Sequence, residues 1–513
     1  MVALLSNINI DPIKGYFKEE TYFAGFNQYT LELLDEESML YSEKITTVIL
    51  FIDGEEFLKD RVYEQLQNEE ILTTANERIT ALLKVIEKYI SSRKDVLFFI
   101  NSIVLPVHSV TAFLTQNNTS FLDIESSINN RIKEMCKRSK NFLMIDWQTI
   151  VKNHGYSRLH DDKFWYLGRI KLNNKGLLLL TEGYCDLLNA YRGETKKVLV
   201  LDLDNTLWGG VIGEDGPAAI KLSEEGKGKI FRDFQKIIKL LKQVGIILCI
   251  NSKNNKEDVN SVFKNHPMMI LKSKDFVIKK INWNDKVVNM QEIANELNLG
   301  LGSFVFIDDN PTEREYVKKS LPAVVVPEFP QDITTLKVWF FESIIYKYFA
   351  KTYLVKEDLL KTNYYKNKLQ RDAFSTQISF DEFIKNIEIK LKIYTNPKQY
   401  IQRISQLTQK TNQFNFTTKR YSELDIARYL EEKDCKIFAL EYEDKFGQEG
   451  LTGVAILKVN FAKGESCLDT FLLSCRIIGK NVEQAFFYEI LKRLKREKVR
   501  FIEINFSPTK KMT

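Results

Sequence analysis

The chain has 513 residues, 44% of them hydrophobic, which is enough for about two to four domains with packed cores. Its formal net charge of +6 is small for this length and does not by itself indicate a nucleic-acid-binding protein. No window approaches the roughly 18 apolar residues of a membrane span, and the six cysteines include no CxxC pair, so we expect a soluble cytoplasmic protein without a disulfide framework or a zinc site.

Residues 1–190 alternate short apolar runs with helical patterns. This alternation is typical of an α/β domain built on a parallel sheet. The predicted strands lie within residues 2–10, 46–52, 95–105 and 141–147, and the longest helical pattern spans 62–93.

Residues 196–334 alternate more strictly, which predicts a second α/β domain with a doubly wound parallel sheet. The predicted strands are 197–204, 245–252, 268–273, 303–309 and 323–328, with helices near 227–243, 255–264 and 284–298. Because ordinary crossover helices use up the connections, we expect no large cap domain over this sheet. A site without a lid favours a substrate presented on a protein, or closure by a neighbouring domain.

Residues 335–379 are rich in Tyr, Lys and Phe at helical spacing, and we expect a helical connector there. Residues 380–513 show strand patterns before a long helix, which is typical of an α+β domain. The strands are expected at 387–394, 436–446, 451–460, 466–478 and 499–506, and the helix at 481–497. The basic run 491–500 is either a solvated helix face or a docking surface for an acidic partner.

The segment Lys196–Trp208, KKVLVLDLDNTLW, carries the clearest chemical signal of the chain. The apolar run is typical of a buried parallel strand, and side chains two residues apart share one face of a strand. Asp202 and Asp204 therefore project together from its carboxyl end, the edge at which open α/β sheets bind ligands. Their mutual repulsion requires a bound cation or a proton on one of them.

These two acids suit phosphoryl transfer. Asp202 can act as a nucleophile that forms an aspartyl phosphate, and Asp204 can protonate the leaving oxygen and later activate water. Mg²⁺ is the ion expected to be held by both carboxylates, because it prefers carboxylate oxygens and bridges to substrate phosphate. The structural alternative is a set of solvated loop acids.

Three further signals are expected at the same edge of the sheet. Ser252 ends an apolar strand and can donate its hydroxyl to phosphate oxygens. Asp308 and Asp309 end another strand and add carboxylates to the metal site. Lys286 precedes a helix and can neutralise the charge on the phosphorylated aspartate.

The order of these motifs resembles the haloacid dehalogenase (HAD) superfamily of phosphatases. Three longer strings look like the FkbH-like branch of that superfamily: VLDLDNTLWGGVIGEDG at 200–216, INWNDKVVNMQEIANELNLG at 281–300 and FVFIDDNPTEREYV at 304–317. By this resemblance, Lys286 rather than Lys279 or Lys280 would complete the phosphate site together with Ser252.

The resemblance also implies roles for the four acids. Asp202 would be the nucleophile and Asp204 the acid/base. Asp309 would be the carboxylate closest to the metal, and Asp308 would support it.

In the FkbH-like family, the third block resembles an N-acetyltransferase-like (GNAT) domain. The matching strings here are LTQKTNQFNFTTKRY at 407–421, FGQEGLTGVAIL at 446–457 and DTFLLSCRIIGKNVEQAF at 469–486. Arg476 and Gly479 match a turn that holds a cofactor pyrophosphate at a helix N-terminus, whereas Asn481 replaces the usual small residue. We therefore expect this turn to bind a pantetheine phosphate. A capped structural helix is the alternative.

Cys475 directly precedes this turn. A thiol beside Arg476 and a helix N-terminus would have a lowered pKa and could accept an acyl group. A buried structural cysteine is the alternative. Because the chain stops at SPTKKMT, before the last helix and strand of such a domain, we expect this domain to be truncated.

The first block resembles the SGNH-hydrolase-like fold. Ser6 and Asn101 match two of its positions, but Gly168 and Lys171 stand where that fold has an acid and a histidine. Since a serine without its base is a weak nucleophile, we expect a scaffold or a carrier-docking domain here, and not a hydrolase.

By resemblance, FkbH-like proteins take a glyceryl unit from 1,3-bisphosphoglycerate, remove phosphate and load the unit onto the thiol of an acyl carrier protein. We expect this chain to do so through an aspartyl phosphate. The expected partners are a phosphorylated three-carbon substrate and the phosphopantetheine arm of a carrier protein. The alternatives are a capless HAD phosphatase that acts on a sugar phosphate or another small metabolite, and a protein that binds a phosphorylated ligand without turnover.

Overall fold

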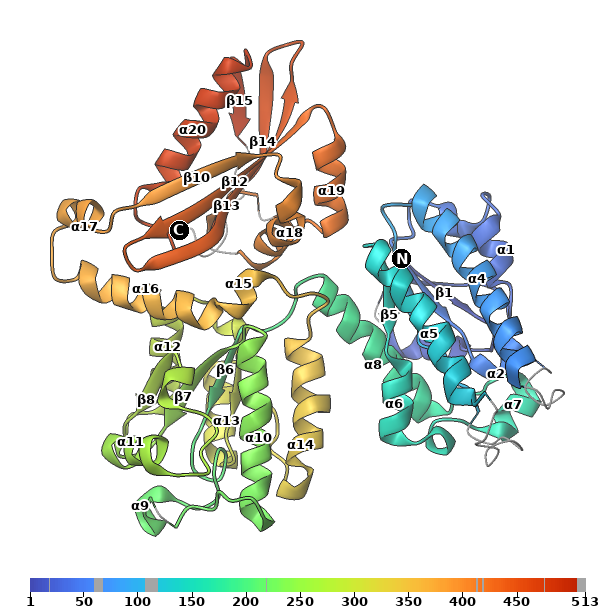
Figure 1. The fold of residues 1–513 in the computed structure, drawn as a ribbon, viewed down its shortest axis with the longest axis horizontal. Coiled ribbons are helices and arrows are strands. Elements are labelled where there is room, and N and C mark those ends of the chain that lie inside the picture. The colour runs from blue at the N-terminus through green and yellow to red at the C-terminus, as the bar shows by residue number, and fades with distance from the viewer. Residues whose placement is uncertain are drawn as a thin grey trace. The chain divides into compact units, whose positions relative to one another are not determined.

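The computed structural model describes residues 1–17, 19–59, 68–106, 119–217, 219–411, 414–417, 419–474 and 476–504. The chain divides into two compact units, Met1–Leu188 and Asn189–Thr513 (Figure 1). Among the described residues, no helix has both the length and the apolar character that a membrane-spanning segment needs.

The first unit contains a parallel five-stranded sheet with the order β2-β1-β3-β4-β5, as the alternating pattern predicts. Its strands are β1 (Val2–Ser6), β2 (Thr21–Phe23), β3 (Thr47–Phe51), β4 (Leu97–Asn101) and β5 (Phe142–Ile145). Helices α4 (Asn68–Ser92) and α5 (Phe121–Arg138) pack on one face, where the ring of Phe98 contacts Tyr89. Helix α8 (Asn174–Tyr191) packs on the other, where Tyr184 contacts Phe99. Hydrophobic side chains thus cover both faces, as a parallel sheet requires.

The second unit begins with a parallel four-stranded sheet of order β8-β7-β6-β9. Its strands are β6 (Val198–Leu201), β7 (Ile247–Ser252), β8 (Ile278–Ile281) and β9 (Phe304–Ile307). The helices are α10 (Gly226–Gln243), α11 (Lys256–Asn265), α12 (Lys286–Leu297) and α13 (Pro311–Ser320). Alternate residues of β6 enter two separate cores: Leu199 and Leu201 on one face, Val198 and Val200 on the other. The doubly wound arrangement is confirmed.

Two apolar runs of this sheet do not form the strands that we expected. Residues 268–273 do not pair with the sheet, because the side-chain carbonyl of Gln235 accepts hydrogen bonds from the backbone amides of Ile270 (3.1 Å) and Leu271 (3.2 Å). The strand β8 lies further along the chain. Residues 323–328 contribute only an isolated bridge between Val325 and Val305.

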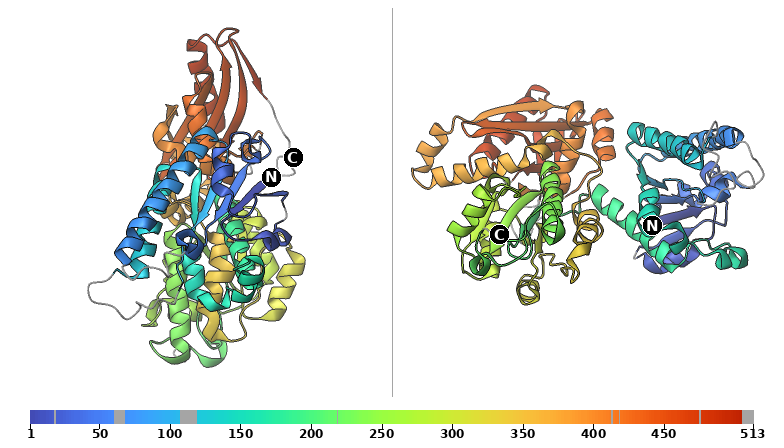
Figure 2. Two further views of the ribbon diagram at one scale, coloured as in Figure 1. Left: turned by 90° about the vertical axis from the view of Figure 1, so that its right-hand side faces the viewer. Right: turned by 60° about the horizontal axis from the view of Figure 1, so that its bottom comes forward.

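The segment after this sheet is helical, as expected. It comprises α14 (Leu336–Trp339), a π-helix (Phe340–Phe349), α15 (Lys356–Leu359) and α16 (Lys361–Ser375). Phe340 packs edge-on against Phe234 of α10, so the first part of the segment belongs to the core of the four-stranded sheet. Helix α16 lies between the two sheets of this unit, in contact with α12 and with β13 (Figures 1 and 2).

The last sheet has the order β10-β12-β13-β14-β11, and β15 pairs with β14 in parallel while the other pairs are antiparallel. The strands are β10 (Lys390–Thr395), β11 (Phe414–Asn415), β12 (Cys435–Asp444), β13 (Gly447–Asn460), β14 (Glu465–Leu473) and β15 (Phe501–Ile504). The helices are α17 (Phe380–Asn386), α18 (Ile401–Lys410), α19 (Glu423–Glu431) and α20 (Val482–Arg496). The predicted α+β arrangement is present, although β14 ends at Leu473, earlier than expected.

Candidate active site

The carboxyl end of β6 is shaped by a tight turn. The backbone amide of Asp202 donates to the carbonyl of Ile307 (3.0 Å) and so ties the end of β6 to the end of β9. Asn205 then adopts a left-handed conformation with φ of 51°, and the amide of Leu207 donates back to the carbonyl of Leu203 (2.8 Å). An asparagine tolerates this backbone better than most residues. The turn fixes the directions of Asp202, which precedes it, and of Asp204, which lies within it.

Asp202, Asp308 and Asp309 form an acidic cluster in which one carboxylate oxygen of each lies within 4.8 Å of the others. Asp202 and Asp308 are buried, and Asp309 is half-buried. Burial and the neighbouring Asp202 raise the pKa of Asp308 to about 7 and that of Asp309 to about 6. Three converging carboxylates in a desolvated site are the arrangement that a divalent cation stabilises.

Lys286 is the cation within this cluster. Its ammonium group lies 2.5 Å from Asp308 Oδ2 and 3.2 Å from Asp202 Oδ1, and the side chain is buried. Burial alone would lower the pKa of Lys286, but the charges of Asp202 and Asp308 outweigh that effect and raise it. The two other candidate lysines bond elsewhere: Lys279 to Ser273, and Lys280 to Glu292 at 2.5 Å.

Two asparagines hold the backbone of Lys286 in place. Asn251 of β7 donates to the Lys286 carbonyl (2.8 Å), and Asn289 donates to Asn251 Oδ1 (3.1 Å). Both asparagines are completely buried. Lys286 is the first residue of α12, so this network fixes the start of the helix relative to the sheet.

Asp204 does not join the acidic cluster, which differs from the predicted set of four magnesium ligands. Its Oδ1 accepts hydrogen bonds from Trp208 Nε1 (2.8 Å) and from the amide of Ile212 (3.2 Å). Its Oδ2 accepts one from Asn254 (3.0 Å), whose amide also donates to Ser252 Oγ (3.0 Å). The turn that follows Asp202 thus directs the carboxylate of Asp204 toward Trp208 and the amide of Ile212, and Asn254 links it to Ser252.

Residues 207–217 and 219–221 belong to a small flap at the same edge. Gly209 and Lys221 exchange backbone hydrogen bonds (3.2 and 2.7 Å), and the short helix α9 (Ile212–Asp215) lies between them. A pocket of about 440 Å³ opens beside Asp309 and is lined by Lys221 and Lys227, among others. It provides space and positive charge next to the acidic cluster.

Sequence reasoning did not identify Asn254 or Arg314. The guanidinium of Arg314 donates to the carbonyls of Asp308 (3.1 Å) and Asp309 (2.7 Å) and so fixes the loop that carries both acids. Asn254 follows a strand end in SKNN, the position that singled out Ser252, and could have been found by the same rule. Arg314 can hold this loop because its side chain is buried beneath it. Nothing in the sequence around its position in α13 indicates that burial.

The predicted cofactor turn of the last domain is engaged within the chain. Arg476 lies 2.9 Å from Glu449 and is buried, with its guanidinium over the ring of Tyr364. The amide of Gly479 donates to Glu483 Oε1 at 2.7 Å. A carboxylate of the protein thus occupies the place that we expected for a phosphate. Cys475 lies outside the described residues.

In the first unit, Lys171, which we expected at the position of a histidine, belongs to a salt bridge. Lys171 is buried and donates to Asp53 at 2.8 Å and to Glu55. Ser6 accepts a hydrogen bond from the amide of Ile8 (3.1 Å), and the side chain of Asn101 bonds the backbone of β3's end. An ammonium group held by two carboxylates is a poor base for a serine.

Comparison with known proteins agrees with this architecture. A family model described as FkbH, N-terminal domain, matches residues 11–189. The N-terminal part of the protein BF1531 from Bacteroides fragilis, a crystal structure containing a phosphatase domain complexed with Mg, is 28% identical, with a TM-score of 0.61 over 66% of this chain and 92% of that chain. A search of the curated proteins finds no match.

The ribosomal-protein-S18-alanine N-acetyltransferase from Escherichia coli is 14% identical over 22% of this chain and 66% of its own, with a TM-score of only 0.19. The last domain is therefore described by its own strand order, β10-β12-β13-β14-β11, and not by this similarity. Residues 11–189 thus match the FkbH N-terminal domain, and 66% of the chain is similar in fold and sequence to a protein that contains a phosphatase domain.

Proposed function

We propose that this protein is a magnesium-dependent phosphatase and glyceryl transferase that acts through an aspartyl phosphate at Asp202. The observation that carries the proposal is the buried cluster of Asp202, Asp308 and Asp309 around the ammonium group of Lys286. We propose with it a division of the chain into domains at 1–190, 196–334 and 380–513, joined by the connector 335–379.

The acidic cluster fits magnesium by its donor chemistry. Asp202, Asp308 and Asp309 would supply hard carboxylate oxygens, and burial makes their shared negative charge costly without a cation. The magnesium complexed by the protein BF1531 is consistent with this assignment. When bound, the ion would offset the charge of the cluster and of the substrate phosphate.

The reaction at Asp202 has two displacements. A carboxylate oxygen of Asp202 bonds to phosphorus, the bond from phosphorus to the leaving oxygen breaks, and protonated Asp204 gives its proton to that oxygen. Water then attacks phosphorus, Asp204 takes up the proton, and the Asp202 carboxylate leaves with free phosphate as the other product. Lys286 and the Ser252 hydroxyl stabilise charge on the phosphoryl oxygens.

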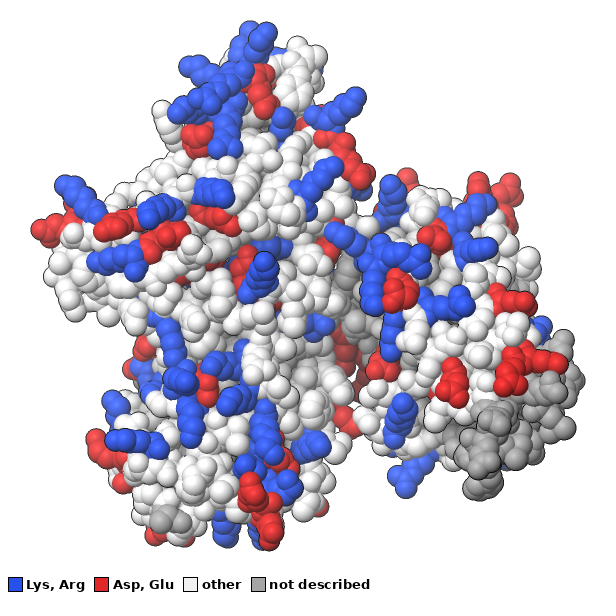
Figure 3. All heavy atoms as spheres, in the orientation of Figure 1, with Lys and Arg blue, Asp and Glu red and all other residues white. Residues whose placement is uncertain are grey.

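The transfer step would use the acyl phosphate of 1,3-bisphosphoglycerate. Its carbonyl carbon bonds to the thiol sulfur of the phosphopantetheine arm or of Cys475, the bond from carbon to the phosphate oxygen breaks, and the thiol proton goes to phosphate. Lys221 and Lys227 beside Asp309 would suit a three-carbon substrate with a second charged group. Figure 3 shows Lys and Arg side chains gathered over α20, whose last turn carries three basic residues, and this surface would suit an acidic carrier protein.

One observation favours a plain phosphatase of small metabolites as the second candidate. Arg476 and Gly479 are both bonded to carboxylates of the chain, Glu449 and Glu483, so a pantetheine phosphate at this turn would have to displace Glu483. In that case the last domain would support the phosphatase without carrying an acyl group.

Phosphate release tests the phosphatase. With p-nitrophenyl phosphate and magnesium, we expect Asp202→Asn to lower kcat by at least about 100-fold, because it removes the nucleophile. Asp233→Asn, on the exposed face of α10, is the matched control and should keep full activity. Equal activity of Asp202→Asn and the unaltered protein would refute an aspartyl phosphate at this residue.

Intact-mass measurement separates the two candidates. After incubation with 1,3-bisphosphoglycerate and magnesium, a glyceryl or phosphoglyceryl adduct that is absent from Cys475→Ala supports the transferase. Phosphate release with no adduct on the protein and none on an added carrier protein supports the plain phosphatase.

A further inference from the structure

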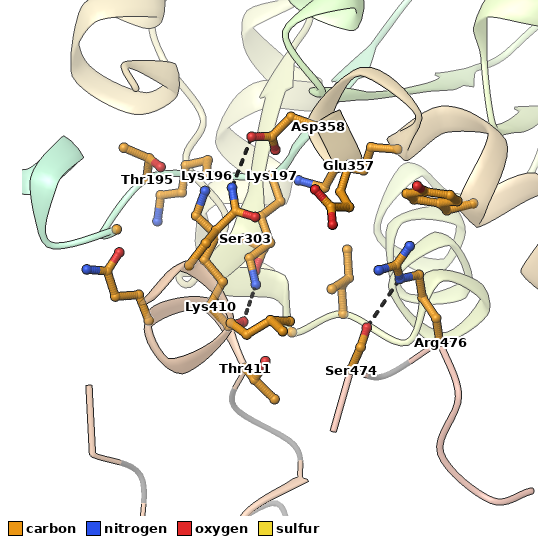
Figure 4. A pocket seen from close by; sticks show the side chains of 18 of the residues that line it. Thr195, Lys196, Lys197, Ser303, Glu357, Asp358, Lys410, Thr411, Ser474 and Arg476 are labelled. Atoms are coloured by element: carbon orange, nitrogen blue, oxygen red, sulfur yellow. Dashed lines mark hydrogen bonds between the residues drawn. The ribbon is translucent and has the colours of Figure 1, made fainter. Parts of the chain in front are cut away.

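A second cavity, of about 360 Å³, lies in the unit Asn189–Thr513 away from the acidic cluster. Figure 4 shows Lys196 and Lys197 at its wall, at the amino end of β6, whereas Asp202 follows the carboxyl end of the same strand. Asp202 is five residue steps along the strand from Lys197, which is about 16 Å. The cavity is therefore distinct from the candidate active site.

Positive charge predominates in this cavity. Seven lysine and arginine side chains line it, against three acidic ones. They precede β6, lie in α16 and α18, precede α19 and follow β14. Basic residues from five separate segments thus converge on one cavity.

Two of the three acidic side chains of the cavity, Asp358 and Glu357, are already engaged. Asp358 lies 2.8 Å from Lys351 and accepts a hydrogen bond from Gln406 (3.0 Å). Glu357 lies 3.8 Å from Arg403. Burial favours the neutral form of Asp358, but Lys351 and Lys361 outweigh it and lower its pKa to about 2. One ionised aspartate serves several cations, which leaves a surplus of positive charge.

Lys361 and Lys410 carry this surplus. Within the described part of the chain, no carboxylate lies within ion-pair distance of either ammonium group, while the backbone carbonyl of Lys410 accepts a hydrogen bond from Lys197 (2.6 Å). Burial, and then repulsion from Lys351, lower the pKa of Lys410 to about 7 and that of Lys361 well below its usual value. Desolvated amines that face a cavity and have no carboxylate at ion-pair distance are sites for an anion, because a bound anion favours their charged form.

The other walls have room for a short organic group. Tyr364 and Tyr365 are buried and line the cavity together with Leu407. The ring of Tyr364 stacks against the Arg476 guanidinium, with 4.5 Å between that group and the ring centre. A ligand in this space would meet charge at one end and aromatic and aliphatic surface at the other.

We propose that this cavity binds a small phosphate ester, with the phosphate held between the ammonium groups of Lys361 and Lys410. A dianionic phosphate matches two ammonium groups that have no carboxylate at ion-pair distance, whereas a monocarboxylate would leave one of them without a partner. The ester could be a free metabolite or the phosphopantetheine end of a carrier protein, since both present the same phosphate chemistry.

Calorimetric titration of the full chain tests this site. The background is Asp202→Asn in EDTA, so that the candidate active site neither turns over the probes nor contributes metal-dependent binding. The probes are inorganic phosphate, 3-phosphoglycerate, 4′-phosphopantetheine and, as a monoanion, acetate. We expect phosphate and at least one ester to bind, and acetate to bind at least tenfold more weakly. The tighter of the two esters identifies the source.

Added substitutions localise the binding. Lys361→Met and Lys410→Met should each weaken phosphate binding at least tenfold, and Lys229→Met, on the exposed face of α10, should leave it unchanged. Because each cavity substitution removes an uncompensated charge, the unfolding temperature without ligand should not fall. Failure of all phosphate probes to bind, equal affinity for acetate, unchanged affinity in both cavity variants, or a lower unfolding temperature of both would overturn the proposal. None of these outcomes bears on phosphate release at Asp202.

Discussion

Asn254 joins Asp204 to Ser252 in the candidate active site. Its amide nitrogen donates to a carboxylate oxygen of the first and to the hydroxyl of the second, at 3.0 Å each. The residue is buried, whereas the neighbouring Asn255 is exposed and bonds Asp258 and Trp283 instead. Two adjacent asparagines therefore form a matched pair, with one inside the site and one outside it.

Asn254→Ala should lower kcat for phosphate release by about 10- to 100-fold with a smaller change in KM, because Asp204 loses the group that fixes its direction. Asn255→Ala should lower it by less than about threefold. Steady-state kinetics with p-nitrophenyl phosphate and magnesium measures both. Equal losses in the two variants would contradict a positioning role for Asn254.

The effect of magnesium on stability should depend on pH. The pKa values of Asp308 and Asp309 are raised from 3.8 to about 7 and about 6. Between pH 4 and pH 7 the folded protein therefore binds protons that the unfolded chain has lost, and the free energy of unfolding falls as the pH rises through this window. Above it the acids are ionised and become ligands for the ion.

We thus expect magnesium to raise the unfolding temperature more at pH 8 than at pH 5.5, as measured by thermal unfolding with and without the ion. In Asp309→Asn the rise at pH 8 should shrink. The same rise at both pH values would mean that the ion binds elsewhere.

The sequence allowed the acidic cluster to be predicted but not the side chains that orient it. Asp202, Asp308 and Lys286 follow strand ends or begin a helix, and parallel topology alone brings such positions together. The direction of Asp204 depends on the left-handed turn at Asn205, which a motif spacing does not encode. The contact between Gly479 and Glu483 depends on a helix start that the sequence places only to within a few residues.

At the scale of elements, α16 is joined to the last sheet by buried charges. Arg371 of α16 is completely buried and lies 2.5 Å from Asp444 of β12 and 2.7 Å from Glu449 of β13. Glu449 also pairs with Arg476, so the four side chains balance one another. Loss of one member leaves charge buried without a partner.

Arg371→Met should therefore lower the free energy of unfolding by about 3–5 kcal/mol. Lys390→Met removes an exposed partner of Glu443 at 4.0 Å and should cost no more than about 1 kcal/mol. Urea unfolding followed by circular dichroism measures both. If the two substitutions cost the same, the buried charges do not hold α16 to the sheet.

Predictions of elements failed where a side chain competes with the sheet for backbone hydrogen bonds. Residues 268–273 have the composition of a strand, yet Gln235 accepts the amides of Ile270 and Leu271. A hydrophobic pattern predicts which residues are buried, and Leu271 is indeed completely buried. The pattern does not predict which group accepts the hydrogen bond of a buried backbone amide. The strands β6, β7 and β9 were predicted because burial and pairing coincide there.

At the scale of the whole molecule, all residues of the candidate active site belong to the unit Asn189–Thr513. A fragment that begins after α8, residues 192–513, should therefore fold and release phosphate with a kcat within about threefold of the full chain. Circular dichroism and the phosphatase assay measure this, with Asp202→Asn in the same fragment as the control. A folded but inactive fragment would mean that the first unit contributes to catalysis.

Two of the outermost strands of the second unit, β8 and β10, carry lysines. β8 presents Lys279 and Lys280, and β10 presents Lys390 and Lys392. If the same strand of another copy approached either edge, its lysines would lie close to these lysines, and the like charges would repel each other. At these two edges, lysine charge thus opposes pairing with a further strand, although Lys280 is itself paired with Glu292 and Glu296.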